Sequence, residues 1–176
     1  CIRDRYHDAV LALIEYPFDA LYFTGFKSLD DAQCALMGAR AVYDGPVLIS
    51  LVPNEEGMLS GGRTLSEGVA LCDEYGADVI GVVSDAPARV LVGFAKEMAS
   101  VTDKPLLVDV SVRRKDRRQF EPTDENPYPT ADAIVELAVR LRAQGVQFLR
   151  ASGAATPAYT GALLATVGGS DVVVPQ

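Results

Sequence analysis

The sequence predicts an α/β fold built on a parallel sheet. Five short apolar runs recur along the chain, and each is followed by a polar turn and then by an amphipathic stretch. The runs lie at residues 20–23, 47–51, 79–83, 106–110 and 147–149. Most of them are apolar throughout, which is typical of strands buried on both faces of a parallel sheet. Runs that alternate with helices indicate successive βα units with right-handed crossovers.

An additional helix is expected before the first strand, at about residues 3–15. Helical spacing there places Tyr6, Val10, Leu13 and Ile14 on one face. We therefore expect this helix to pack that face against the rest of the domain.

Capping residues mark where the later helices begin and end. Thr64 with Glu67 forms a capping box, and Ser28 with Asp31 has a similar spacing. Further expected N-terminal caps are Asp85, Thr130, Asp132 and Thr156, the last followed by Pro157. Glycines that follow helical stretches are Gly45, Gly76 and Gly145.

Composition and charge exclude several classes of protein. The chain has 176 residues, and we expect one domain over residues 1–176. Its formal charge of 16 − 24 = −8 would repel a phosphate backbone, so nucleic-acid binding is not expected. No apolar run approaches the roughly 20 residues of a membrane helix. The chain opens with Cys1 and shows no signal peptide, so we expect a trimmed N-terminus and a cytoplasmic location.

Two architectures fit the repeated βα units, an open doubly wound sheet and a β/α barrel. Local pattern does not choose between them. No glycine-rich phosphate loop follows any strand, which removes the best signal for a nucleotide-binding sheet. Gly57, Gly61 and Gly62 are read as turn glycines.

Five segments in order resemble the homocysteine S-methyltransferase domain, especially the one at the front of cobalamin-dependent methionine synthases. The first four segments are 19–32, 45–47 together with the loop 61–65, 76–81 and 104–108, and the fifth spans 145–157. The stretch 145–149 then leads into 150–157, which stands where that family has Gly-Gly-Cys-Cys-Gly-Thr-Thr-Pro. The resemblance implies a TIM-type barrel of eight strands, of which this chain supplies the fourth to the eighth. The first three strands have no counterpart.

The same resemblance implies a zinc site that this chain does not supply. Family enzymes hold Zn²⁺ with three cysteine thiolates, and the zinc activates the homocysteine sulfur. The three positions here are Ser84, Ser152 and Gly153. Hydroxyls and a glycine do not replace thiolates on this metal, so we expect no zinc and no other cofactor. Thr24 likewise stands where the family has a glutamate.

Other residues that could take part in catalysis or binding have simpler structural interpretations. Cys34 and Cys72 lie in helical stretches and are read as small core residues, and His7 has no partners for a site. The segment 113–118 is the one basic cluster of this acidic chain, with a charge of 5 − 1 = +4. It is read either as an exposed loop or as an anion site formed by Arg113, Arg114, Lys115, Arg117 and Arg118.

The leading hypothesis is a homocysteine S-methyltransferase-like domain that has lost zinc-dependent methyl transfer and acts by binding or regulation. The expected partners are a small molecule, or a corrinoid or folate protein. Self-association, or pairing with the missing N-terminal part, is expected as well. The alternative is an active methyltransferase or lyase with a rebuilt metal-free site, and a third reading is a structural fragment. The residues expected to line a substrate pocket are Thr24, Ser84, Asp85, Arg150, Ser152 and Gly153.

Overall fold

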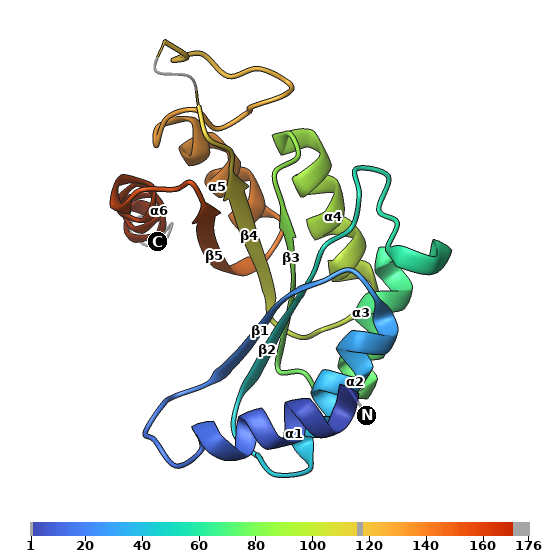
Figure 1. Ribbon diagram of the computed structural model, residues 1–176. Helices are drawn as coiled ribbons and strands as arrows, with labels where there is room; N and C mark the ends of the chain where they lie inside the picture. The colour runs from blue at the N-terminus through green and yellow to red at the C-terminus, as the bar shows by residue number, and fades with distance from the viewer. Residues whose placement is uncertain (1, 116–117, 171–176) are drawn as a thin grey trace, which may run out of the picture.

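A parallel sheet of five strands forms the centre of the molecule (Figure 1). The computed structural model describes residues 2–115 and 118–170. The strands are β1 (Leu21–Phe26), β2 (Val47–Leu51), β3 (Val79–Ser84), β4 (Leu106–Val112) and β5 (Val146–Gly153). They lie in sequence order, and every neighbouring pair is parallel. The predicted α/β class is confirmed.

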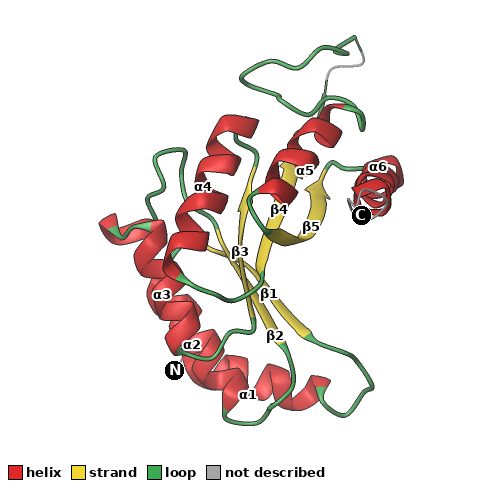
Figure 2. Ribbon diagram, turned by 180° about the vertical axis from the view of Figure 1, so that it is seen from behind, coloured by secondary structure: helices red, strands yellow, loops and turns green. Residues whose placement is uncertain are grey.

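In the part of the chain that the structure describes, six α-helices and one short 3-10 helix connect and cover these strands. The α-helices are α1 (Ile2–Leu13), α2 (Leu29–Arg40), α3 (Leu65–Glu74), α4 (Ala88–Val101), α5 (Ala133–Ala143) and α6 (Pro157–Ser170), and the 3-10 helix is η1 (Ser60–Gly62). Seen from behind, α3, α4 and α5 lie along one side of the sheet (Figure 2). The α6 helix lies beyond the last strand, next to β5 (Figure 1).

The main core lies between the sheet and this helical layer. Ile49, Ile80, Leu106 and Val146 belong to one row across the paired strands and are all buried. Residues in register on parallel strands face the same side, so this row marks the face that the helices cover. Alternate rows must therefore face the other side of the sheet.

The predicted strands are present, and the first and the last extend three residues or more beyond their apolar runs. The first strand continues to Phe26 across an irregularity in register, with Gly25 at a positive φ of 92°. The last strand continues to Gly153 and keeps its pairing with β4 through residues that are not apolar. Hydropathy alone does not reveal these extensions because pairing to the neighbouring strand, not burial, holds them.

Two of the expected helix caps are confirmed, and the one expected at Asp85 is wrong. Thr64 and Glu67 form a complete capping box, and the Ser28 side chain accepts from the Asp31 N–H at 3.4 Å. The α4 helix is preceded by Pro87 and not by Asp85, whereas α5 is preceded by Asp132 as expected; neither Pro87 nor Asp132 makes a side-chain cap hydrogen bond. Asp85 does not cap α4, because its carboxylate pairs with an arginine described below.

The opening helix packs on α2 through a narrower face than expected. Val10 is buried, and the Tyr6 ring meets the Phe23 ring edge to face at 5.8 Å. Leu13, however, is 50% exposed, so the predicted four-residue face is wrong at its C-terminal end. Gly38 of α2 brings the two helices so close that a Cβ there would meet the Arg3 carbonyl oxygen at 2.7 Å. The contact therefore centres near the start of α1 and leaves its end unsupported.

The sheet is curled but not closed within the described residues. β1 and β5 each pair with one neighbour only, so both are edge strands. The prediction of a barrel is therefore confirmed only as a parallel β/α sheet. The described strands show no closure.

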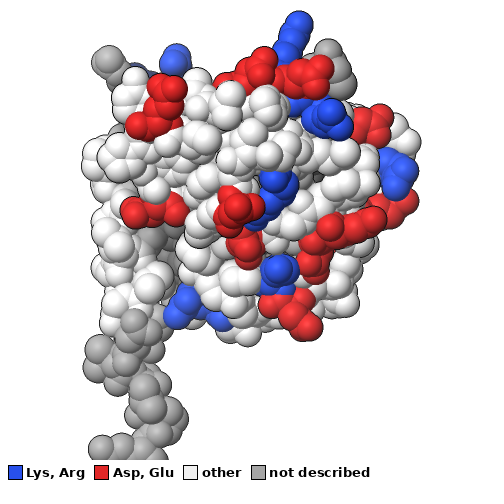
Figure 3. All heavy atoms as spheres, turned by 90° about the horizontal axis from the view of Figure 1, so that it is seen from below, with Lys and Arg blue, Asp and Glu red and all other residues white. Residues whose placement is uncertain are grey.

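The six described helices are 10 to 14 residues long. Among the described residues, no helix combines the length and the apolar character that crossing a bilayer requires. Seen from below, at the end where the strands begin, acidic and basic side chains are interspersed (Figure 3). No broad basic face of the kind used for nucleic acid is visible in this view.

Candidate polar site on the uncovered face of the sheet

The face of the sheet away from the main core carries a chain of hydroxyl groups at β1 and β2. The Tyr22 and Ser50 hydroxyl oxygens lie 3.0 Å apart, and Ser50 donates to the Thr24 hydroxyl at 3.1 Å. Ser50 is fully buried, whereas Thr24 is exposed. These hydrogen bonds therefore link a buried hydroxyl on β2 to the surface at the end of β1.

A charged pair continues this face at β4 and β5. Asp109 and Arg150 are in register, and the Arg150 Nη1 group donates to Asp109 Oδ2 at 2.7 Å. The Asp109 side chain is 1% exposed, while that of Arg150 is 49% exposed. The ion pair therefore joins a buried carboxylate to a guanidinium at the surface, and the carboxylate depends on this partner for its charge balance.

The second oxygen of Asp109 is unpartnered. Oδ1 is buried and has no hydrogen bond to any described residue. Buried carboxylate oxygens normally accept a hydrogen bond, so this atom marks a place where a water or a ligand donor would be stabilised. The guanidinium can also donate further hydrogen bonds, because Nε and Nη2 of Arg150 donate to no described residue.

Arg150 on one edge strand of the sheet also contacts the other edge strand. Its guanidinium carbon lies 5.5 Å from the centroid of the Tyr22 ring, within the range of a cation–π contact. The hydroxyl chain and the ion pair thus form one cluster, which we call the polar cluster: Tyr22, Thr24, Ser50, Asp109 and Arg150. It can bind and orient a polar group. No described contact within it pairs a nucleophile with a general base.

The three positions expected for zinc cysteines lie at the ends of β3 and β5 and do not converge. Register places Ser84 in a row with Val110 and Ser152 in a row with Ser111, so the two serines fall in rows of opposite facing. The Ser84 hydroxyl accepts a hydrogen bond from the Ala86 N–H at 3.1 Å. Its oxygen therefore serves the local turn.

Gly153 is fixed in a backbone conformation that a cysteine would strain. Its φ is 69°, and a Cβ there would lie 2.6 Å from the Val112 carbonyl oxygen. Within the described residues, no group of three or more His, Cys, Asp or Glu side chains could hold a metal ion. The residues at these positions do not fit a thiolate zinc site.

Asp85 and Arg113 are brought together at the same edge of the sheet. Arg113 Nε donates to Asp85 Oδ2 at 2.6 Å, and its Nη1 donates to the Glu125 carbonyl oxygen at 2.6 Å. The hydrogen bond to Asp85 raises the pKa of Arg113, opposed only by partial burial. This arginine ties the end of β3 to the long loop after β4, which is why Asp85 is unavailable as a helix cap.

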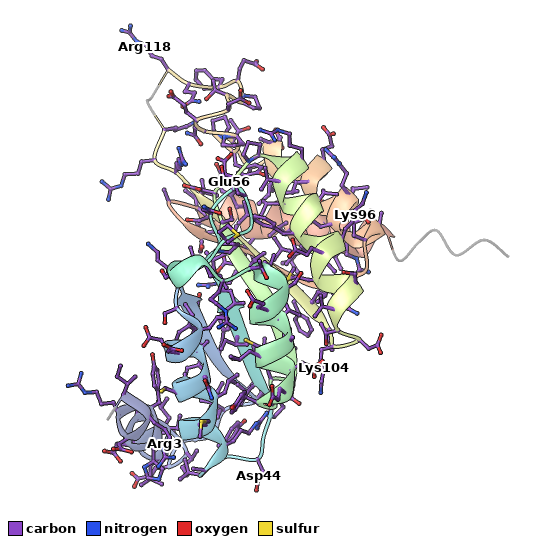
Figure 4. All side chains as sticks on the ribbon, turned by 90° about the vertical axis from the view of Figure 1, so that its right-hand side faces the viewer. Arg3, Asp44, Glu56, Lys96, Lys104 and Arg118 are labelled. Carbon is purple, nitrogen blue, oxygen red and sulfur yellow. The ribbon has the colours of Figure 1, made fainter. Side chains whose placement is uncertain are left out.

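The rest of the basic segment follows the loop that projects past the strand ends (Figure 1). Lys115 lies 5.0 Å from the centroid of the Phe120 ring, and Arg114 is exposed. Arg117 lies outside the described residues, and Figure 4 shows Arg118 at the far end of the loop. Figure 4 also places Glu56 toward this end of the molecule, away from Asp44. Arg113 and Arg118 therefore lie at opposite ends of this loop.

Sequence reasoning singled out Thr24 and Arg150 but missed three members of the polar cluster. Asp109 carried a usable signal, because it is the one charged residue within the apolar run 106–110. Tyr22 and Ser50 carried none, since hydroxyl residues in strands are common. Their relevance depends on which face of the sheet they occupy.

Comparison with known proteins yields structural matches only. No protein-family model matches the sequence, and no curated protein matches it significantly. Homocysteine methyltransferase MmuM from Escherichia coli, in its apo form, aligns with a TM-score of 0.72 at 17% identity over 94% of this chain and 57% of that chain. Its metallated form gives a TM-score of 0.73 at 17% identity, over 94% of this chain and 52% of that one.

Another enzyme aligns almost as completely. Chloride-inhibited dihydrodipicolinate synthase from Acinetobacter baumannii, complexed with pyruvate, has a TM-score of 0.61 at 14% identity, over 94% of this chain and 55% of that chain. These neighbours are TIM-barrel enzymes, and at such identities the likeness shows the fold alone. The chain spans little more than half the length of each of them.

Proposed function

We propose that this chain is a homocysteine S-methyltransferase-like domain that has lost zinc-dependent methyl transfer and acts by binding a partner or a small molecule. The fold likeness to the Escherichia coli enzyme supports the relationship, together with the segment order that the sequence shares with that family. The partner we propose is a small molecule or a corrinoid or folate protein.

One observation carries the proposed loss of chemistry, namely the backbone at position 153. A thiolate there would require a side chain at a positive φ and against the Val112 carbonyl oxygen. Restoring a cysteine would therefore mean moving the β4–β5 pairing, and not only exchanging a side chain. The Ser84 hydroxyl bound to the Ala86 N–H supports the same conclusion at the other end of the site.

A rebuilt metal-free site around Ser84, Asp85, Ser152 and Arg150 remains the alternative. Three of these four groups are engaged in other contacts: Asp85 with Arg113, Arg150 with Asp109 and Ser84 with a backbone N–H. A serine becomes a nucleophile when an adjacent base takes its proton, and no described contact supplies one here. The binding function is therefore the better supported of the two.

The test is metal content and turnover on the same preparation. The protein is purified with zinc supplied, zinc is counted by elemental analysis, and homocysteine is incubated with sulfonium, folate and corrinoid methyl donors. We expect no stoichiometric zinc and no methionine above background. About one zinc per chain that is lost in Ser84→Ala or Ser152→Ala, or methionine formed at an enzyme-like rate, would overturn the proposal.

A further inference from the structure

An apolar groove runs between the open edge of the last strand and the last helix. Its volume is about 290 Å³, near the lower end of the range of roughly 300–1,000 Å³ typical of small-molecule sites. The lining residues shared by β5 and α6 are Gln147, Phe148, Leu149, Arg150, Ala151, Thr160, Leu163, Leu164 and Val167. We call this the β5–α6 groove.

Exposed apolar side chains line both of its walls. Phe148 on β5 is 43% exposed and Leu164 on α6 is 68% exposed, whereas Leu163 is buried. The α6 helix carries no charged residue in its sequence. A helix without a polar face is normally covered on more than one side. The exposed side of α6 therefore favours contact with an apolar group.

Among the described residues that line the groove, Arg150 is the single charged one. One of its nitrogen atoms is held by Asp109, which fixes the guanidinium, while Nε and Nη2 donate to no described residue. A guanidinium with two adjacent N–H donors fits a carboxylate, which can accept both hydrogen bonds. Because Asp109 is buried and Arg150 is half exposed, the exposed charge of this pair is that of the arginine.

We propose that the β5–α6 groove binds a medium-chain aliphatic monocarboxylate, with its carboxylate on Arg150 and its chain along Phe148 and Leu164. Charge complementarity selects an anion, and the apolar walls select an aliphatic body over a compact polar one. The groove's small volume favours a chain of medium length over a long one. The inference stands on the groove alone and does not depend on the proposed function.

The experiment is a ¹H–¹⁵N NMR titration of the whole chain with octanoate. Acetate, which lacks the apolar body, and 1-octanol, which lacks the charge, serve as ligand controls. We expect saturable shifts confined to β5 and α6, with a Kd of about 0.1–1 mM for a ligand of this size. Acetate and octanol should bind at least tenfold more weakly.

Three variants separate the parts of the proposal. Arg150→Met removes the carboxylate partner, and Leu164→Asp places a repelling charge on the exposed wall while leaving the Asp109–Arg150 pair intact. Each should weaken octanoate at least tenfold. Arg3→Met changes an exposed arginine at the start of α1 and should have no effect.

Several results would overturn the inference. They are shifts that do not saturate, equal binding of octanol, or octanoate binding that survives Leu164→Asp in a folded protein. A dimer at NMR concentrations that buries β5 and α6, and dissociates on Leu164→Asp, would show that a second copy occupies the groove instead.

Discussion

The guanidinium of Arg150 on the last strand lies 5.5 Å from the ring of Tyr22 on the first strand. These two strands are the edges of the sheet and have no hydrogen bonds to each other. Contact between their side chains requires a sheet curled back on itself, as in the barrels of the structural neighbours. Arg150 also forms the ion pair with Asp109, so its side chain contacts both the first strand and the buried carboxylate of the fourth.

We expect Arg150→Met to destabilise the protein by about 1–3 kcal/mol, because Asp109 would be left buried without a partner. The expected loss of stability is no larger because the Arg150 side chain is half exposed to solvent. The measurement is urea denaturation, and adding Asp109→Asn should recover part of the loss if the pair is coupled. Arg3→Met, whose arginine pairs with Asp4 at 3.9 Å on the surface, is the control and should cost less than about 0.5 kcal/mol. Equal losses in Arg150→Met and Arg3→Met would contradict the assigned role.

Gly81 should tolerate no side chain, because a Cβ there would collide with the carbonyl oxygen of Leu107 on the neighbouring strand. We expect Gly81→Ala to cost about 1–3 kcal/mol through forced movement of β3 against β4. Gly93 offers a matched control, since it lies exposed in α4 with open space at its Cβ. Gly93→Ala should stabilise by roughly 0.5–1 kcal/mol. Thermal denaturation of both variants tests the pair, and a neutral Gly81→Ala would mean that the β3–β4 pairing differs from that described here.

Asp78 should make stability depend on pH in the acid range. Partial burial acts to raise the pKa of Asp78, but hydrogen bonds from the Val47 N–H and Arg40 outweigh it and hold the pKa below the ordinary 3.8. The carboxylate therefore stabilises the folded state fully above that value, and this contribution is lost as pH falls through the folded pKa. In Asp78→Asn the free energy of unfolding should fall less steeply below about pH 4. Identical slopes for the two proteins between pH 2 and pH 5 in urea titrations, at about 25 °C, would rule this out.

Cys72 should be inert in the folded protein. It is fully buried in α3, and burial raises the pKa of its thiol to about 12, so almost no thiolate forms near neutral pH. Iodoacetamide at about pH 8 should leave Cys72 unmodified, as read by peptide mass spectrometry, and should label it once guanidinium chloride unfolds the chain. Rapid labelling without denaturant would show that α3 opens locally.

The sequence determined the local elements of this fold. The capping box at Thr64 and Glu67 involves residues three apart, and the glycines Gly76 and Gly145 take the positive φ values expected after helices. Such features depend on residues that are close in the sequence, so a sequence pattern can predict them. Buried parallel strands were equally readable, because continuous apolar runs satisfy burial whatever the neighbouring strand is.

Only the tertiary structure decided how charges and hydroxyls are partnered. Asp85 had the sequence of a helix cap, yet Arg113, 28 residues away, takes its carboxylate. Arg150 and Asp109 are 41 residues apart and meet because their strands are in register. Ser84 and Ser152 share the sheet's edge but fall in rows of opposite facing, which no local pattern records. Register and curvature arise from packing of the whole sheet, so they determine which side chains meet even where each strand was correctly predicted.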